Sequence, residues 1–107
     1  MTITKNAPTA ANQPLAEQVQ NFWERSWSRP GYHPTWVVAD IPTELRAAVA
    51  AQWFAPGSKL LDIGCGSGEL SAWLAEQAFS VHGIDCAQGA IDRAQASYHA
   101  LANRLSF

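Results

Sequence analysis

Three closely spaced glycines in the middle of the chain could form a ligand-binding turn. The segment Gly64-Cys65-Gly66-Ser67-Gly68 follows a short apolar run and precedes a helical pattern of leucine and tryptophan. Glycine allows a tight turn there, and its missing Cβ lets a ligand approach the backbone closely. The helix that follows would offer free N–H groups and a partial positive charge at its N-terminus. This context indicates a nucleotide-type ligand.

A carboxylate follows this loop at the distance expected of an acid that binds a ribose. Asp85 ends the next apolar segment, 17 positions after Gly68. Because parallel strands end at the same edge of a sheet, we expect Asp85 beside the glycine loop. A carboxylate can accept hydrogen bonds from both hydroxyls of one ribose. The alternative is that Asp85 only caps the helix that begins near Ala87.

The spacing of the glycines separates two classes of nucleotide-type ligand. A dinucleotide fingerprint needs its third glycine three positions after the second, but that position holds Glu69, and the glycine falls one earlier at Gly68. A carboxylate at the start of the helix would also repel a pyrophosphate. Glu69 is instead expected to interact with the helix dipole. Both observations favour a ligand without phosphates over a dinucleotide.

The elements that must position these residues alternate between strand and helix. Short apolar runs predict strands at 59–63 and 79–84, and helical spacing predicts helices at 69–78 and from about 88 to 101. Residues 105–107 resemble the opening of a third strand. This order predicts an α/β fold with right-handed crossovers and a parallel sheet.

Two further helices are expected before this sheet. Apolar spacing predicts a helix from Leu15 to about Trp27, and Pro42 suits the first turn of a second one that Pro56 and Gly57 end. Residues 1–14 are polar and predict a disordered tail. The expected organisation is a tail at 1–14, a helical and loop segment at 15–56, and an incomplete ligand-binding domain at 57–107.

Composition excludes several classes of partner. The net charge of the 107 residues is −2, and no run of Lys or Arg suggests a grip on nucleic acid or a membrane surface. No apolar stretch is long enough to span a bilayer, and the N-terminus lacks the apolar segment of a signal peptide. The chain is therefore expected to be soluble and cytoplasmic. The two cysteines, Cys65 and Cys86, indicate neither a disulfide framework nor a zinc site. We expect both to be small buried residues.

Two segments together resemble class I S-adenosylmethionine (SAM)-dependent methyltransferases. Residues 60–69 are similar to the first motif of that family, and residues 81–87 to its second strand. The resemblance implies SAM as cofactor, with the Gly64–Gly68 loop around its methionine part, Asp62 holding its amino end, Asp85 on the ribose and Cys86 near the adenine. The leader with Trp23, Trp27 and Trp36 resembles thiopurine-type and related small-molecule methyltransferases.

The tryptophans allow more than one role. For Trp23 and Trp27, four apart on a helix, a core role is favoured over a lid on the cofactor. Trp36 lies in a loop, where its aromatic face could sit against the sulfonium. Trp53 and Trp73 follow apolar helical spacing and are expected in the core. His33 is expected to be a surface residue.

The resemblance also implies what this length of chain lacks. It implies an α/β fold that is the N-terminal part of a Rossmann-like doubly wound parallel sheet, with strands 1, 2 and the start of 3. The family orders its strands 3-2-1-4-5, so strand 1 would be a sheet edge here, with one face uncovered. We expect a truncated N-terminal fragment of a methyltransferase for small molecules, which holds half of the cofactor site and is too short to be active alone. Alternatives are a non-catalytic SAM-binding fragment and a dinucleotide-binding remnant. The sequence assigns no catalytic base, no methyl acceptor and no oligomeric state.

Overall fold

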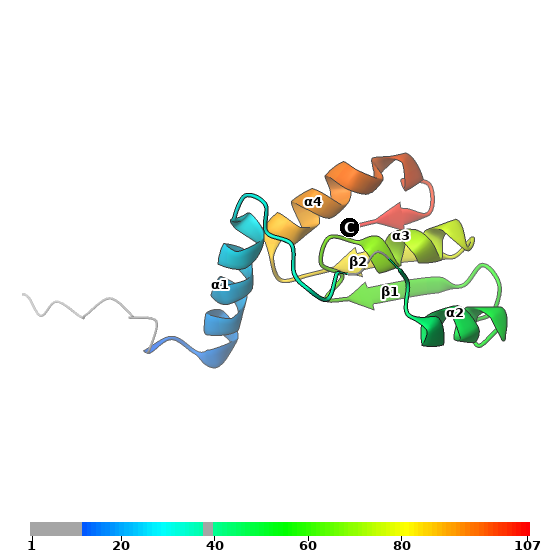
Figure 1. The fold of residues 1–107 in the computed structure, drawn as a ribbon, viewed down its shortest axis with the longest axis horizontal. Helices are drawn as coiled ribbons and strands as arrows, with labels where there is room; N and C mark the ends of the chain where they lie inside the picture. The colour runs from blue at the N-terminus through cyan, green and yellow to red at the C-terminus, as the bar shows by residue number, and fades with distance from the viewer. Residues whose placement is uncertain (1–11, 38–39) are drawn as a thin grey trace, which may run out of the picture.

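Three parallel strands form the sheet on which the rest of the molecule is arranged (Figure 1). The computed structural model describes residues 12–37 and 40–107. The strands are β1 (Lys59–Ile63), β2 (Ser80–Ile84) and β3 (Leu105–Ser106), in the order β1-β2-β3. Leu60 is paired with Val81, and Val81 with Leu105. The predicted α/β fold with a parallel sheet is confirmed.

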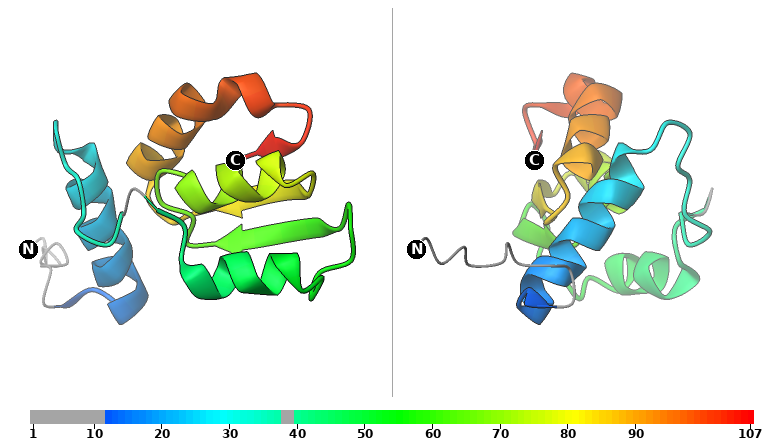
Figure 2. Two further views of the ribbon diagram at one scale, coloured as in Figure 1. Left: turned by 45° about the vertical axis from the view of Figure 1, so that its right-hand side comes forward. Right: turned by 90° about the vertical axis from the view of Figure 1, so that its left-hand side faces the viewer.

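Helices connect the strands as the alternating pattern predicts. The helix α3 (Glu69–Glu76) joins β1 to β2, and α4 (Gln88–Tyr98) joins β2 to β3 through the short 3₁₀ turn η2 (His99–Leu101). Figures 1 and 2 show α3 lying across the sheet, with α4 alongside it. The helix α3 ends two residues before Ala78, whose backbone takes a positive φ of 70° and turns the chain into β2.

One apolar core lies between the sheet and these helices. Side chains along β2 alternate between exposed and buried, so that Val81 points inward while its neighbours point outward. The buried members of the core come from α3, β2, β3 and the turn before β2, and they are Ala72, Leu74, Ala75, Phe79, Val81 and Leu105. Half-buried side chains from the helix α2 (Thr43–Ala50), from η2 and from the C-terminus pack against them, among them Val49, Leu101 and Phe107.

The second predicted helix is present but shorter than expected. The helix α2 (Thr43–Ala50) begins after Pro42, whose carbonyl oxygen accepts hydrogen bonds from the backbone N–H groups of Leu45 and Arg46. Gln52 then takes a positive φ of 57°. This turn directs Trp53 away from the packed face, and its side chain is 79% exposed. The expectation of a core role for Trp53 is therefore wrong, whereas Trp73 does pack against the core.

The helix α1 (Leu15–Ser28) stands at one end of the sheet, beside the start of α4 (Figure 2). Its predicted bounds are confirmed to within a residue. Only Ser26 and Trp27 are buried on it, while Leu15, Val19 and Phe22 remain exposed. Residues 1–11 of the predicted tail lie outside the described residues. None of the helices in the ranges 12–37 and 40–107 is long and apolar enough to cross a membrane.

The far face of the sheet has no covering element in the described part of the chain. Leu61 and Ile63 on β1 are 57% and 75% exposed, and Ile84 on β2 is also exposed. The strand β1 is an edge of the three-stranded sheet. Both features agree with the expectation that strand 1 would form an edge with one bare face.

Two leucines on the two edge strands allow a matched test of this one-sided core. We predict that Leu105→Ala lowers the free energy of unfolding by about 2–3 kcal/mol, because it leaves a cavity in the core. Leu61→Ala should cost less than about 1 kcal/mol, because the side chain is largely in water already. Urea denaturation of the 107-residue chain measures both. Equal losses would show that the bare face is covered in solution.

Candidate functional site

The glycine loop is held in shape by the end of the neighbouring strand. Gly64, Gly66 and Gly68 all have positive φ values, between 56° and 89°, which residues with a Cβ rarely adopt. The backbone N–H groups of Gly64 and Cys65 both donate to the carbonyl oxygen of Ile84, at 2.8 and 2.9 Å. This arrangement fixes the loop against the C-terminal end of β2.

Asp85 lies beside the glycine loop, where the sequence predicted it. Its Oδ2 accepts a hydrogen bond of 2.9 Å from the backbone N–H of Gly66, and its Oδ1 accepts one of 2.9 Å from that of Ala87. The carboxylate thus joins the loop after β1 to the turn before α4. A carboxylate has about four acceptor positions. Two acceptor positions remain after these bonds, so Asp85 can hold the local turn and still bind ligand hydroxyls.

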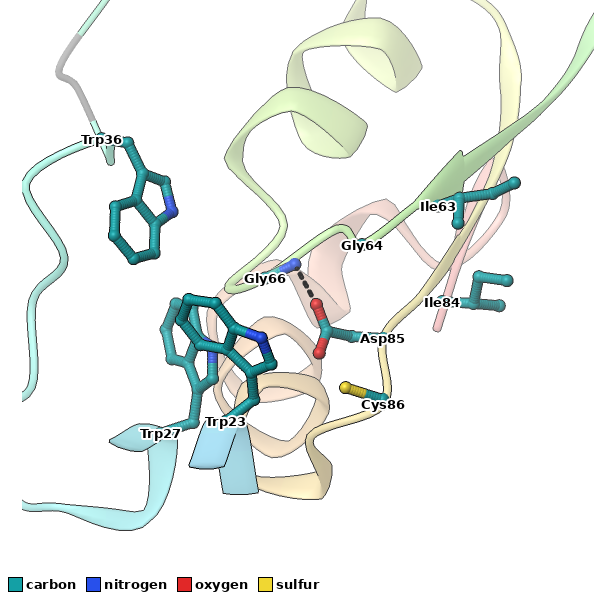
Figure 3. A pocket seen from close by; sticks show the side chains of 9 residues that line it. All are labelled: Trp23, Trp27, Trp36, Ile63, Gly64, Gly66, Ile84, Asp85 and Cys86. Carbon is teal, nitrogen blue, oxygen red and sulfur yellow. Dashed lines mark hydrogen bonds between the residues drawn. The ribbon is translucent and has the colours of Figure 1, made fainter. Parts of the chain in front are cut away.

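A pocket of about 660 Å³ opens at the C-terminal ends of β1 and β2 (Figure 3). Ligands of open parallel sheets bind at this edge. The lining combines three tryptophans, the two strand ends, the loop backbone and a carboxylate: Trp23, Trp27, Trp36, Ile63, Gly64, Gly66, Ile84, Asp85 and Cys86. Of the predicted site residues, the pocket brings together Trp36, Gly64, Gly66, Asp85 and Cys86.

The tryptophans form one wall of this pocket. Figure 3 shows Trp23 and Trp27 extending from α1 toward the glycine loop, with Trp36 coming from a separate loop. The Trp27 ring packs on the loop so closely that a Cβ on Gly66 would lie 3.2 Å from its Cζ2 atom. Trp23 and Trp36 meet edge to face, with ring centroids 5.6 Å apart. The core and pocket roles of Trp27 therefore coexist, since it is 5% exposed and still lines the cavity.

Three predicted site residues, Asp62, Cys65 and Gly68, do not line this pocket. The Oδ2 of Asp62 accepts a hydrogen bond of 2.6 Å from the hydroxyl of Ser71, which is fully buried in α3. Gly68 precedes α3, and a Cβ there would lie 2.6 Å from a ring carbon of Phe107. Cys65 is buried. Asp62 and Gly68 therefore help to join β1, α3 and the C-terminus.

The two cysteines differ sharply in their surroundings. Burial, with a smaller contribution from the negative charges of Asp62 and Asp85, raises the pKa of the Cys65 thiol from 9.0 to about 12. Cys86 is exposed and lies in the pocket wall. The expectation that both are buried is wrong for Cys86, because it follows Asp85 at the strand end, where the chain turns outward before α4.

The start of α3 carries its own negative charge. Glu69 is the first residue of the helix, and its Oε1 accepts a hydrogen bond of 2.5 Å from the hydroxyl of Ser67. A carboxylate held at this position complements the helix dipole and opposes a phosphate. Among the residues that the structure describes, no group of three His, Cys, Asp or Glu side chains is placed to hold a metal ion.

The sequence patterns assigned no pocket role to Ile63 and Ile84, and they favoured the core for Trp23. The two isoleucines are the last residues of adjacent parallel strands. Residues at the ends of adjacent parallel strands lie at the edge where ligands bind, so this position in the sequence could have predicted their place in the pocket. The contribution of α1 depends on contacts across more than 60 residues of sequence, which no local pattern indicates.

Comparison with known proteins relates the chain to methyltransferases. Residues 60–107 match a family described as "Methyltransferase domain". Thiopurine S-methyltransferase from Azotobacter vinelandii is 34% identical over 74 residues, which cover 67% of this chain and 32% of that protein. The chain thus spans about a third of the length of the curated relative that it matches.

Solved structures show the same fold. One, described as "Conversion of a Disulfide Bond into a Thioacetal Group during Echinomycin Biosynthesis", is 26% identical with a TM-score of 0.69, over 83% of this chain and 38% of that one. A SAM-dependent methyltransferase from Thiobacillus denitrificans, in complex with S-adenosyl-L-homocysteine, is 23% identical with a TM-score of 0.52, over 89% and 36%. That likeness concerns the fold alone. Residues 60–107 therefore match the methyltransferase domain family, and the chain carries part of the Rossmann-like fold of SAM-dependent methyltransferases.

Proposed function

We propose that the pocket at the ends of β1 and β2 binds SAM, and that the protein transfers the methyl group of SAM to a small molecule. The observation that carries this proposal is the position of Asp85. Its carboxylate lies against the glycine loop, at the mouth of a tryptophan-lined pocket, in a domain of the methyltransferase family.

The pocket residues fit the parts of SAM. Asp85 keeps two acceptor positions, enough for the two hydroxyls of a ribose. A Cβ on Gly64 would meet nothing within 4 Å, so the space beside this part of the loop is open to a ligand that approaches the backbone. The cavity volume of about 660 Å³ lies in the range of small-molecule and cofactor sites.

The tryptophan wall supports a cationic ligand. The faces of aromatic rings attract cations, and tryptophan does so most strongly. The pocket is lined on one side by Trp23, Trp27 and Trp36, and the Trp36 ring is 58% exposed. A positively charged sulfonium is therefore favoured over a neutral group of the same shape.

A dinucleotide is the competing ligand, and the start of α3 argues against it. A pyrophosphate would take the N-terminus of the helix after the loop. The Glu69 carboxylate already lies in that turn, anchored by the Ser67 hydroxyl. Like-charge repulsion would weaken binding of a phosphate at this position.

The role of the chain in this proposal is to bind and orient SAM. Bound SAM would supply a methyl group that is already activated, so the protein needs chiefly to hold it at the right place and angle. Asp85 would fix the ribose, the glycine loop would hold the methionine part, and the tryptophan wall would exclude water from the sulfonium side. We assign no general base, because a base is needed only for an acceptor that must lose a proton.

The acceptor class is proposed from the relatives. The name of the Azotobacter protein specifies a thiopurine sulfur, and the description of the structural relative concerns a disulfide and a thioacetal. Small molecules with a sulfur nucleophile are therefore the first acceptors to test. Transfer of methyl groups from SAM to a panel of thiols, with amines and alcohols for comparison, tests this assignment.

Asp85→Asn tests the role of the carboxylate. We predict that S-adenosyl-L-homocysteine binds the variant roughly 10- to 100-fold more weakly, because hydrogen bonds to a charged group contribute about 1.5–3 kcal/mol. Isothermal titration calorimetry measures the dissociation constant. Asp92→Asn, an exposed change of the same charge on α4, is the control and should bind as the parent does. Binding of NADH without binding of S-adenosyl-L-homocysteine would overturn the assignment.

The two cysteines provide a second test that needs no substitution. We predict that iodoacetamide at pH 8 alkylates the exposed Cys86, and that S-adenosyl-L-homocysteine slows this reaction at least about tenfold by covering the pocket. Cys65 should react only after unfolding, because its pKa of about 12 leaves almost no thiolate at pH 8. Mass spectrometry of the two cysteine peptides gives both rates. Unchanged alkylation of Cys86 at a saturating ligand concentration would place the ligand elsewhere.

A further inference from the structure

The helices α1 and α4 cap each other, although more than 60 residues separate the contacts. The first of the two caps is Glu24 on α1. Its Oε2 accepts a hydrogen bond of 2.6 Å from the backbone N–H of Gln88, and its Oε1 accepts one of 3.3 Å from that of Gly89. These are the first two residues of α4, whose N-cap residue Ala87 has no side-chain acceptor of its own.

The second cap is Arg93 on α4. Its Nη2 donates a hydrogen bond of 2.8 Å to the carbonyl oxygen of Arg29, the C-cap residue of α1, and its Nη1 donates to the carbonyl oxygen of Tyr32. A carboxylate thus meets the positive end of α4, and a guanidinium meets the negative end of α1. Both charges complement the helix dipoles.

Trp27 lies between the two caps. The Cζ atom of Arg93 lies 5.4 Å from the centroid of the Trp27 ring. Gly89 permits the close approach of α1, because a Cβ there would lie 3.0 Å from the backbone C and O atoms of Trp27. The N-cap residue Ala87 and Ala90 on α4 are fully buried and form one apolar cluster with Trp27. The reciprocal caps therefore determine where the Trp27 ring meets Gly66.

We propose that Glu24 and Arg93 are positioning residues for the cofactor pocket, and this inference rests on the function proposed above. Neither side chain lines the pocket. They join the turn that carries Asp85 and Cys86 to the helix that carries Trp23 and Trp27, so they set the gap between two opposite walls. Loss of either cap would widen that gap and weaken the binding of a ligand that must contact both walls.

The experiment uses the 107-residue chain labelled with 5-fluorotryptophan and observed by ¹⁹F NMR. Glu24→Ala should shift the Trp23 and Trp27 signals and raise the dissociation constant of S-adenosyl-L-homocysteine about tenfold. Glu24→Gln keeps one carbonyl acceptor for the N–H groups and should recover part of both effects. The control Glu17→Ala removes the same charge from an exposed position two turns earlier on α1, and it should change neither.

Gly89→Ala gives an independent test that leaves every charge in place. Its Cβ should push the Trp27 backbone away from α4 and produce the same two changes, while the circular dichroism of the folded domain is retained. If Glu24→Ala unfolds the chain, Glu24→Gln and Gly89→Ala decide the matter. The inference is wrong if these variants leave the Trp27 signal and the dissociation constant as they are in Glu17→Ala.

The two proposals fail in different ways. If the parent chain does not bind S-adenosyl-L-homocysteine, the proposed function fails for this chain. The ¹⁹F signals without ligand then still report whether the caps position the tryptophans. If the parent binds and the signals shift without any change in affinity, the caps hold α1 but do not set the pocket, and the positioning role is overturned.

Discussion

The arrangement of this molecule depends on the hydrogen bonds that tie the glycine loop to the end of β2. The carbonyl oxygen of Ile84 accepts two N–H groups of the loop, and the carboxylate of Asp85 accepts a third from Gly66. These bonds bring the end of β1, the end of β2 and the start of α4 to one point. The position of Trp27 in the pocket wall is fixed relative to that point, because its ring packs on Gly66.

The same junction explains how a short chain can build a defined pocket on a small sheet. The parallel strands β1 and β2 end side by side. Because Gly66 has no Cβ, the Trp27 ring can pack directly on the loop. A separate N-terminal helix then contributes the aromatic wall. The apolar core under α3 holds the sheet, while the polar caps between α1 and α4, together with the packing of Trp27 on Ala87 and Ala90, hold that wall.

Much of the sheet was predictable from sequence, because its signals are local. Short apolar runs predicted β1 and β2, and the glycine loop together with Asp85 indicated the edge of the sheet that carries the pocket. The prediction for Trp53 was wrong because its helical spacing continued past the point where Gln52 reverses the backbone. The pocket position of Trp23 depends on where α1 docks. That docking rests on contacts between residues 24 and 88, and single-sequence periodicity carries no information about such a pair.

The small buried surface of α1 has a thermodynamic consequence. Only Ser26 and Trp27 of this helix are buried, so its detachment from the sheet exposes little apolar surface and belongs to the low-energy openings of the molecule. A ligand that touches Trp23 and Trp27 binds only the docked form. By linkage, ligand binding then stabilises the docked form, so the docked fraction of α1 rises with ligand concentration until the pocket is saturated. Occupancy of the pocket and protection of α1 from proteolysis are, in that sense, one equilibrium.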